Sequence, residues 1–190
     1  MRTWTSRLAG LVFLALAASA LAAEVAGVKL EERVTVGDAE LVLNGAGVRT
    51  RVVFKVYVGA LYLPARTGDA KAAIAAPGPR RVMMHMLRDL GSDSLTGALN
   101  EGLQKNHTPE QLQALEPKVK ELTAILTRDK EIKQGTVIFL DGIPGTGTRV
   151  TANGKVLGTV AGDELFPALM RVWLGDKPAD EDLKKGMLGG

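Results

Sequence analysis

Basic and phenolic side chains recur between Arg49 and Tyr57, and they are the residues of this chain best suited to chemistry. Arg49, Arg51, Lys55 and Tyr57 occupy odd-numbered positions, so they project from one face if the segment is a β-strand. An arginine can bind a carboxylate through two parallel hydrogen bonds, and a tyrosine hydroxyl can donate a third. The pattern therefore predicts an anion-binding site. The competing interpretation is an exposed strand face whose charges give solubility.

The spacing of these side chains decides which of them can share one ligand. We expect a single strand from Arg49 to Leu63, ended by Pro64. On a regular strand Lys55 and Tyr57 lie about 7 Å apart, which suits a shared ligand, whereas Arg49 and Tyr57 lie roughly 26 Å apart. Arg49 and Tyr57 can therefore meet only through a bend in the chain or through a ligand much longer than a carboxylate.

Other kinds of site find little support in the composition. The chain has no cysteine, and its two histidines, His85 and His107, are far apart in sequence, which disfavours zinc, copper and iron–sulfur sites. The glycine-rich segment 142–148 lacks the lysine of a phosphate-binding loop, and no serine stands in a nucleophile-elbow motif. We expect no cofactor and no metal.

The first 22 residues have the features of a secretory signal peptide. Arg2 and Arg7 precede an apolar run from Leu8 to Leu21, which is shorter than the roughly 20 apolar residues of a membrane span. We expect cleavage after Ala22 and a periplasmic or secreted domain of residues 23–190 with no later membrane segment. Loss of the two arginines lowers the net charge from +3 to +1, which disfavours nucleic-acid binding.

The rest of the pattern predicts one α+β domain in which helices cover one face of an antiparallel sheet. Glycines at Asn44–Gly47 indicate a turn between early strands, and Asn153-Gly154 indicates a tight hairpin. Thr108 with Gln111 forms a capping box. We expect later strands at 81–87, 136–140, 148–152 and 155–160, and helices at 69–76, 95–103, 108–126, 163–175 (capped by Asp163) and 178–185 (opened by Pro178).

Two blocks of the sequence resemble the signatures of the chalcone isomerase-like superfamily, most closely those of its exported bacterial branch. The first block runs from Leu43 to Arg49, with the sequence Leu-Asn-Gly-Ala-Gly-Val-Arg, and continues from Phe54 to Pro64. The second block contains Leu165-Phe166, Trp173 to Pro178, and Leu183 to Gly189. The resemblance spans about residues 25–189. It implies an open-faced β-sandwich, a large antiparallel sheet covered by a layer of helices, with a cleft between sheet and helices.

The resemblance also implies roles for individual residues. In the plant enzymes the cleft cyclises a chalcone, and in non-catalytic members it holds a fatty acid. Arg49 matches the arginine of the Gly-Ala-Gly-x-Arg motif, and Tyr57 stands where the enzymes have threonine but fatty-acid-binding members pair tyrosine with arginine. Asn100 or Asn106 matches a helical asparagine, and Val172 replaces a pocket threonine. The helical catalytic tyrosine has no counterpart here, so true chalcone isomerase activity is not expected.

The leading hypothesis is therefore a non-catalytic, exported protein that binds a small amphipathic ligand such as a fatty acid. Its expected ligand-binding residues are Arg49, Tyr57, Lys55, Asn100 and Val172, with further cleft walls from Leu99, Leu103 and Leu169. One alternative is an isomerase or intramolecular lyase acting on an unsaturated carbonyl compound, with Arg49 stabilising an enolate and Tyr57 exchanging a proton. The other is an accessory protein of an envelope complex, docked through the basic strand face.

Overall fold

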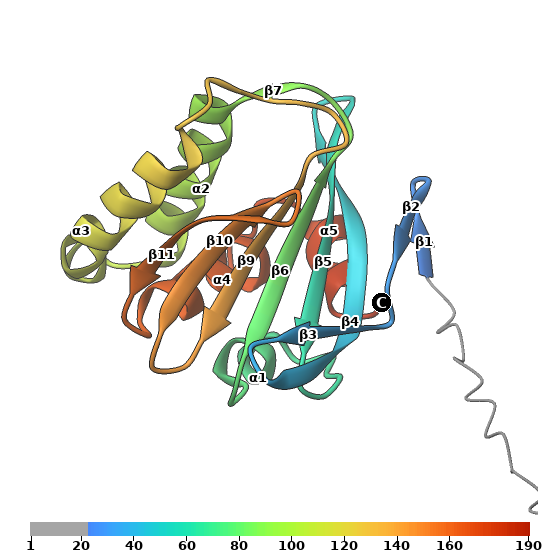
Figure 1. Cartoon of the computed structure of the whole chain (residues 1–190), viewed down its shortest axis with the longest axis horizontal. Coiled ribbons are helices and arrows are strands. Elements are labelled where there is room, and N and C mark those ends of the chain that lie inside the picture. The colour runs from blue at the N-terminus through green and yellow to red at the C-terminus, as the bar shows by residue number, and fades with distance from the viewer. Residues whose placement is uncertain (1–22) are drawn as a thin grey trace, which may run out of the picture.

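A seven-stranded sheet forms the centre of the protein in the computed structural model, which describes residues 23–190. The predicted signal peptide lies outside the described residues. The strand order is β11-β10-β9-β6-β5-β4-β3, and every neighbouring pair is antiparallel. Figure 1 shows the helices gathered on one side of this sheet, with the small β1–β2 ribbon beside β4 on the other. The predicted α+β architecture with a helical layer over a large antiparallel sheet is confirmed.

The elements follow one another in the order β-β-β-β-β-α-β-β-α-α-β-β-β-β-α-α. The strands are β1 Ala23–Val25, β2 Val28–Leu30, β3 Arg33–Val36, β4 Ala39–Arg51, β5 Phe54–Leu63, β6 Arg80–Met86, β7 Leu90–Gly91, β8 Glu131–Ile132, β9 Val137–Ile143, β10 Gly147–Ala152 and β11 Lys155–Ala161. The helices are α1 Ala70–Ala75, α2 Ser92–Asn106, α3 Pro109–Leu126, α4 Leu165–Leu174 and α5 Glu181–Met187. Among these residues no helix combines the length and apolarity needed to span a membrane.

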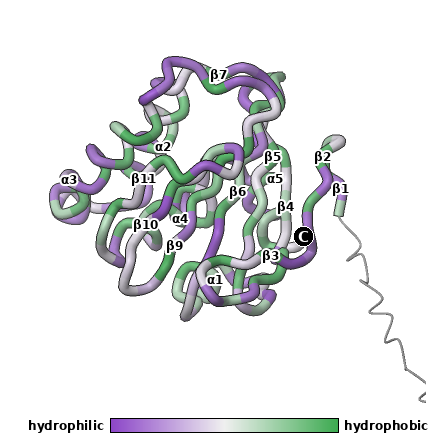
Figure 2. Tube along the Cα trace, viewed as in Figure 1, coloured by the Kyte–Doolittle hydropathy of each residue, from purple (hydrophilic) through white to green (hydrophobic). Residues whose placement is uncertain are grey.

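Both faces of the central sheet are apolar, and we call them the helix face and the open face. On β5 the side chains of Tyr57, Leu61 and Leu63 join the core under the helices, whereas Val58 and Tyr62 join a second, smaller cluster on the open face. That second cluster includes residues of β2 and β3, so the N-terminal strands cover part of the open face. Figure 2 shows the outer helix α3 alternating between hydrophilic and hydrophobic stretches, because only one side of this helix packs inward.

Locally encoded features agree with the sequence. Thr108 and Gln111 form the expected capping box at the start of α3. Asn153 and Gly154 both have positive φ, at 46° and 79°, as a type I′ turn between β10 and β11 requires. Asp69 caps α1 by accepting a hydrogen bond from the backbone nitrogen of Ala72. In each of these motifs the interacting residues lie within a few positions of each other in the sequence.

The predicted single strand from Arg49 to Leu63 is wrong. The chain instead turns back at Val52-Val53, so that β4 and β5 form a hairpin closed by the pair Arg51 and Phe54. Neither valine is a usual turn residue. The correction removes the distance problem, because Arg49 is now the direct cross-strand partner of Tyr57, and such partners lie about 5 Å apart at Cα.

The predicted turn at Asn44–Gly47 is also wrong, because these residues lie inside β4. The glycines serve close packing: a Cβ at Gly45 would lie 2.2 Å from the carbonyl oxygen of Gly186, and one at Gly47 would lie 3.2 Å from the Cα of Leu183. Glycine inside a strand often marks such a close approach of backbone. These two positions therefore let α5 rest directly on the sheet.

Two predicted helix starts need correction. Asp163 does not cap α4; its carboxylate accepts a hydrogen bond from the backbone nitrogen of Gly145 at 2.9 Å, and Glu164 occupies the cap position without a side-chain hydrogen bond. The last helix is capped by Asp180, which accepts from the backbone nitrogen of Leu183 at 3.0 Å, rather than opened by Pro178. The position of Asp180 matters because it fixes one side of the candidate site.

Candidate functional site

A small cavity of about 50 Å³ lies between the sheet, α2 and the segment that links α4 to α5. Apolar side chains form most of its wall, and Arg49 and Tyr57 contribute polar groups. The lining residues are Arg49, Arg51, Val56, Tyr57, Leu90, Ser94, Leu95, Ala98, Leu99, Val172 and Ala179. This volume admits one or two water molecules, whereas pockets for small ligands usually measure about 300–1,000 Å³. The cavity is therefore too small, with its side chains in these positions, to hold such a ligand.

The guanidinium of Arg49 is held at the end of the cavity next to α5. Its Nη1 donates a hydrogen bond to the carbonyl oxygen of Ala179. The neighbouring residue Thr50 donates its backbone N–H to the carboxylate of Asp180 at 2.9 Å, so strand and helix are joined at two consecutive residues. Arg49 makes no ion pair within 4 Å in the described part of the chain, so its charge is not neutralised by a direct carboxylate contact.

The hydroxyl of Tyr57 accepts a hydrogen bond from the indole Nε1 of Trp173 at 2.9 Å. Burial raises the pKa of Tyr57 above the ordinary value for tyrosine, and the positive charge of Arg49 offsets only part of that rise. The phenol is therefore neutral at physiological pH and keeps its proton. Since Trp173 fills the acceptor side of the oxygen, the O–H remains available as a donor beside Arg49.

A β-bulge decides which neighbours of Tyr57 reach the cavity. Arg49 pairs with Tyr57, but Thr50 pairs with Lys55, so Val56 is an extra residue in β5. A bulge interrupts the alternation of side chains and re-aims them. Val56 therefore lines the cavity together with Tyr57, whereas Lys55 is exposed and does not line it.

The remaining predicted site residues divide in the same way. Val172 is buried and lines the cavity, as does Leu99. Asn100 lies on α2, half-buried and away from the cavity wall, and Asn106 instead binds the backbone of Gly102 and Lys177. Leu103 and Leu169 are core residues that do not line the cavity. The structure thus brings Arg49, Tyr57 and Val172 together and leaves Lys55 and Asn100 outside.

Sequence reasoning missed several contributors to the site, and three of them show why. Trp173 was not among the expected site residues, although a buried indole N–H usually requires an acceptor, and that rule could have directed attention to a partner such as Tyr57. Ala179 contributes a backbone carbonyl, for which side-chain patterns carry no signal. Val56 lines the cavity because of the bulge, and no local sequence motif predicts that bulge.

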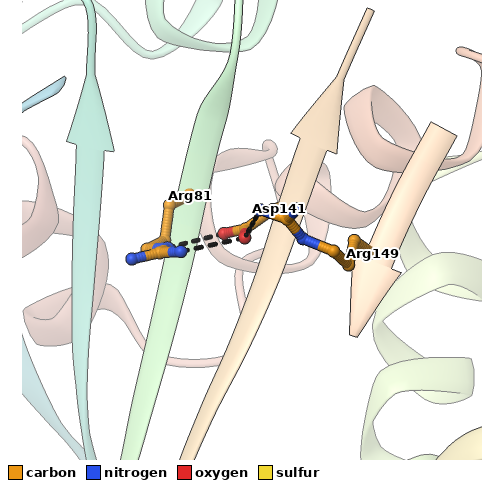
Figure 3. A network of polar contacts seen from close by, with 3 residues as sticks. All are labelled: Arg81, Asp141 and Arg149. Carbon is orange, nitrogen blue, oxygen red and sulfur yellow. Dashed lines mark hydrogen bonds and ion pairs between the residues drawn. The ribbon is translucent and has the colours of Figure 1, made fainter. Parts of the chain in front are cut away.

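A second arginine cluster lies on the open face, and its bonding is different. Asp141 on β9 is fully buried and stands between Arg81 on β6 and Arg149 on β10, its direct cross-strand partners. Figure 3 shows both guanidinium groups turned toward the one carboxylate. Arg81 binds it at 2.6 and 2.9 Å, and Arg149 binds it at 3.0 Å. Both carboxylate oxygens are therefore occupied within the protein.

Comparison with known proteins places the fold. A family model described as chalcone isomerase-like matches residues 22–189. The chain belongs to the chalcone isomerase-like family. A solved structure with the same fold is a fatty-acid binding protein of Arabidopsis thaliana, with a TM-score of 0.64 and 15% sequence identity, covering 85% of this chain and 92% of that one. No curated protein sequence matches the chain.

Membership of the chalcone isomerase-like family explains why the two signature blocks occur together. The side chain of Asn44, in the first block, donates to the carbonyl oxygen of Met187, in the second block, at 2.7 Å. The glycines of the first block accommodate α5, and Arg49 binds the carbonyl oxygen of Ala179 just before that helix. The blocks therefore form one structural unit, which fixes the wall of the cavity nearest Arg49.

Residues 23–190 contain no group of three or more histidine, cysteine, aspartate or glutamate side chains placed to hold a metal ion. The polar side chains that line the cavity are Arg49, Arg51, Tyr57 and Ser94, and all of them can donate hydrogen bonds. Such a set suits an anionic or carbonyl oxygen.

Proposed function

We propose that the cavity binds the carboxylate of a small amphipathic molecule, such as a fatty acid, without catalysing its conversion. The observation that carries the proposal is the pairing of Arg49 with Tyr57. Two donors with unused hydrogen-bonding capacity lie side by side, and apolar side chains surround them. A carboxylate would take hydrogen bonds from both, and its alkyl chain would contact Leu95, Leu99 and Val172. The structural likeness to a plant fatty-acid binding protein agrees with this proposal.

Room for the alkyl chain requires the cavity to open. A surface hollow of about 320 Å³ adjoins it, and Arg51, Val56 and Leu90 line both spaces. Movement of the Arg51 and Leu90 side chains would join the two into a channel of the size usual for small ligands. We propose that the carboxylate lies at Arg49 and Tyr57 and that the channel opens beside Leu90.

The protonation state of Tyr57 favours binding over proton abstraction. A general base needs a pKa near the working pH, whereas burial raises the pKa of this phenol. A carboxylate bound beside it would raise that pKa further, since negative charge opposes ionisation. Tyr57 is thus suited to donate a hydrogen bond to an anion. Turnover of an enone that disappears in Tyr57→Phe would contradict this and favour the isomerase alternative.

The test is native mass spectrometry of residues 23–190, purified without detergent, followed by solvent extraction of any bound molecule. We expect a fatty acid or a similar anionic amphiphile at about one molecule per chain. A preparation that carries no ligand and takes up no added dodecanoate, measured by isothermal titration calorimetry, would overturn the proposal. Dodecanol is the matched control ligand, because it has the same chain and no carboxylate.

We also propose that residues 1–22 are an export signal, so that the working protein is periplasmic or secreted. The basic start, the apolar run and the small residues before Ala23 support it. The mass of the protein recovered from a periplasmic extract tests the cleavage site. A product that retains residues 1–22 in the cytoplasm would contradict export without affecting the ligand proposal.

A further inference from the structure

The tip of the β4–β5 hairpin exposes three consecutive apolar side chains. Val52 is 89% exposed, Val53 77% and Phe54 57%, and only one other large apolar side chain of the described residues, Val156, is comparably exposed. Single exposed apolar residues are normal in proteins. A run of three at a protruding turn is unusual unless it has a function. We call residues 51–55 the β4–β5 tip; Figure 1 shows this cyan turn at the upper end of the molecule, near β7.

The backbone of the tip is strained. Val52 has a φ of 59°, and Val53 is not among the residues of positive φ, the sign pattern of a type II′ turn, which normally has glycine first. A β-branched residue at positive φ is a clear outlier. Folding stability alone would favour glycine at this position, so the apolar side chain is retained at the expense of local conformational energy.

Basic side chains surround the apolar tip. Residues 49–55 contain Arg49, Arg51 and Lys55 and no acid. Arg88 adds a fourth cation, with its Cζ 4.7 Å from the ring centre of Phe54. Three acids lie nearby: Asp180 accepts a hydrogen bond from the backbone nitrogen of Thr50 at 2.9 Å. Asp89 pairs with Lys133 at 3.1 Å and Glu101 with Lys105 at 2.6 Å. The tip therefore combines an exposed apolar turn with positively charged side chains on both flanks.

We propose that the β4–β5 tip docks the protein on membranes that contain anionic phospholipids. Val53 and Phe54 would enter the boundary between headgroups and acyl chains, and Lys55 and Arg88 would bind the headgroup phosphates. Apolar insertion with basic flanks is the usual chemistry of peripheral membrane binding. The three cations that flank the exposed tip, Arg51, Lys55 and Arg88, make an anionic lipid surface the partner that the charge favours, rather than an apolar groove of another protein.

The position of the tip links membrane docking to the candidate ligand site. Val52, Phe54 and Arg88 line the same surface hollow that adjoins the Arg49–Tyr57 cavity. A protein docked by its tip would place this hollow against the lipid surface, where an amphipathic ligand could enter without crossing water. This last step rests on the proposed function, whereas membrane docking itself depends only on the tip.

Sedimentation with vesicles tests the proposal. Residues 23–190 are mixed with phosphatidylcholine vesicles that contain or lack phosphatidylglycerol, at low and high salt. We expect binding only to the anionic vesicles, weakened by salt because the screening length shortens. Val53→Ser/Phe54→Ser should weaken that binding by about tenfold, and Lys55→Gln/Arg88→Gln should do so by roughly tenfold.

Two further variants separate docking from folding. Lys155→Gln/Val156→Ser removes one cation and one exposed apolar side chain from β11, at the opposite edge of the sheet, and should bind vesicles as the wild type does. Val52→Gly relieves the strained turn, so it should melt at a higher temperature and yet bind vesicles more weakly. Equal binding by wild type and the tip variants, or no binding to anionic vesicles, would overturn the proposal.

The failure of docking and the failure of the ligand proposal can be told apart. Val53 lines neither the cavity nor the adjoining hollow, so Val53→Ser, which should weaken vesicle binding, should bind dodecanoate in vesicle-free solution with unchanged affinity. Loss of vesicle binding together with normal dodecanoate binding supports docking. Vesicle binding that persists in this variant opposes docking and leaves the ligand site as a separate question.

Discussion

The two faces of one sheet carry arginine clusters that are built differently. On the open face Asp141 neutralises Arg81 and Arg149, and both oxygens of its buried carboxylate are used. On the helix face Arg49 has only a backbone carbonyl as partner, and the Tyr57 hydroxyl receives a hydrogen bond without giving one. A saturated network holds a structure together, whereas one with unused donors can bind a further group.

Volume alone would suggest the opposite assignment. A groove of about 370 Å³ on the open face, lined in part by Tyr62, Arg81 and Phe139, is larger than the cavity of about 50 Å³ beside Arg49. However, Arg81 is already committed to Asp141 and also stacks on Phe139, its Cζ 4.2 Å from the ring centre. The availability of donors, and not the size of the space, therefore distinguishes the candidate site.

Removing Asp141 from the open-face arginine cluster should give the largest effect of all, and this effect should be a loss of stability. Asp141→Ala leaves two arginines without their shared carboxylate, and we expect the free energy of unfolding to fall by about 3 kcal/mol, because both guanidinium groups retain some access to water. Urea unfolding measures this. Dodecanoate affinity of the folded protein should not change. As a control, Glu116→Ala removes an exposed acid paired with Lys120 on α3 and should leave stability nearly unaltered.

Removing the uncommitted arginine should act on ligand affinity instead. Arg49→Gln should weaken dodecanoate binding by about 2 kcal/mol, roughly 30-fold, through loss of the charge-assisted hydrogen bonds. Titration calorimetry measures the affinity. The matched control is Arg128→Gln, since Arg128 also donates to a backbone carbonyl, that of Leu157, but lies outside the cavity. Weaker binding in Arg81→Gln and not in Arg49→Gln would move the ligand to the open face.

Removing the Tyr57 hydroxyl should affect both stability and binding. In Tyr57→Phe the buried N–H of Trp173 loses its acceptor, which should lower the free energy of unfolding by about 1–2 kcal/mol. Dodecanoate should bind about fivefold more weakly, because one neutral donor is lost. Tyr62→Phe, the corresponding change on the open face, should leave affinity unaltered. Equal affinities in wild type and Tyr57→Phe would remove this tyrosine from the site.

At alkaline pH the buried tyrosines of the two faces, Tyr57 and Tyr62, should both contribute to a loss of stability. Burial raises the pKa of Tyr57, and burial together with Glu31 raises the pKa of Tyr62 to about 12. The folded protein thus holds these protons after the unfolded chain has lost them, so stability is intact below pH 10 and falls above it, by up to about 1.4 kcal/mol per pH unit for each tyrosine. Unfolding curves of wild type, Tyr57→Phe and Tyr62→Phe between pH 9 and about 12 measure the difference. Phenolate absorbance that rises near pH 10 in the folded protein would contradict it.

Several local signals in the sequence were reliable, although the helix starts expected at Asp163 and Pro178 were wrong, and features that depend on distant residues were not predicted. The capping box at Thr108 and the turn at Asn153-Gly154 were predictable because their partners lie within a few residues. The glycines of β4 were misinterpreted as a turn because their reason is α5, far along the chain. The turn at Val52-Val53 could not be predicted, because a β-branched residue disfavours the positive φ that Val52 adopts.

The candidate site shows the same division. The residue types and the family resemblance identified Arg49, Tyr57 and Val172, and the resemblance implied that the first two pair, but the expected single strand kept them apart. Their pairing depends on the hairpin, and the exclusion of Lys55 depends on the bulge at Val56. Regular alternation of side chains along a single strand, without the hairpin or the bulge, predicted Lys55 as a site residue and placed Arg49 too far from Tyr57 to share a ligand.

The most direct test of the central claim compares dodecanoate with dodecanol in wild type and in Arg49→Gln. If Arg49 and Tyr57 hold a carboxylate, the wild type should prefer the acid over the alcohol by at least about tenfold, and Arg49→Gln should lose that preference while still binding the alcohol. An acid preference that survives in Arg49→Gln, or a wild type without one, would contradict the account.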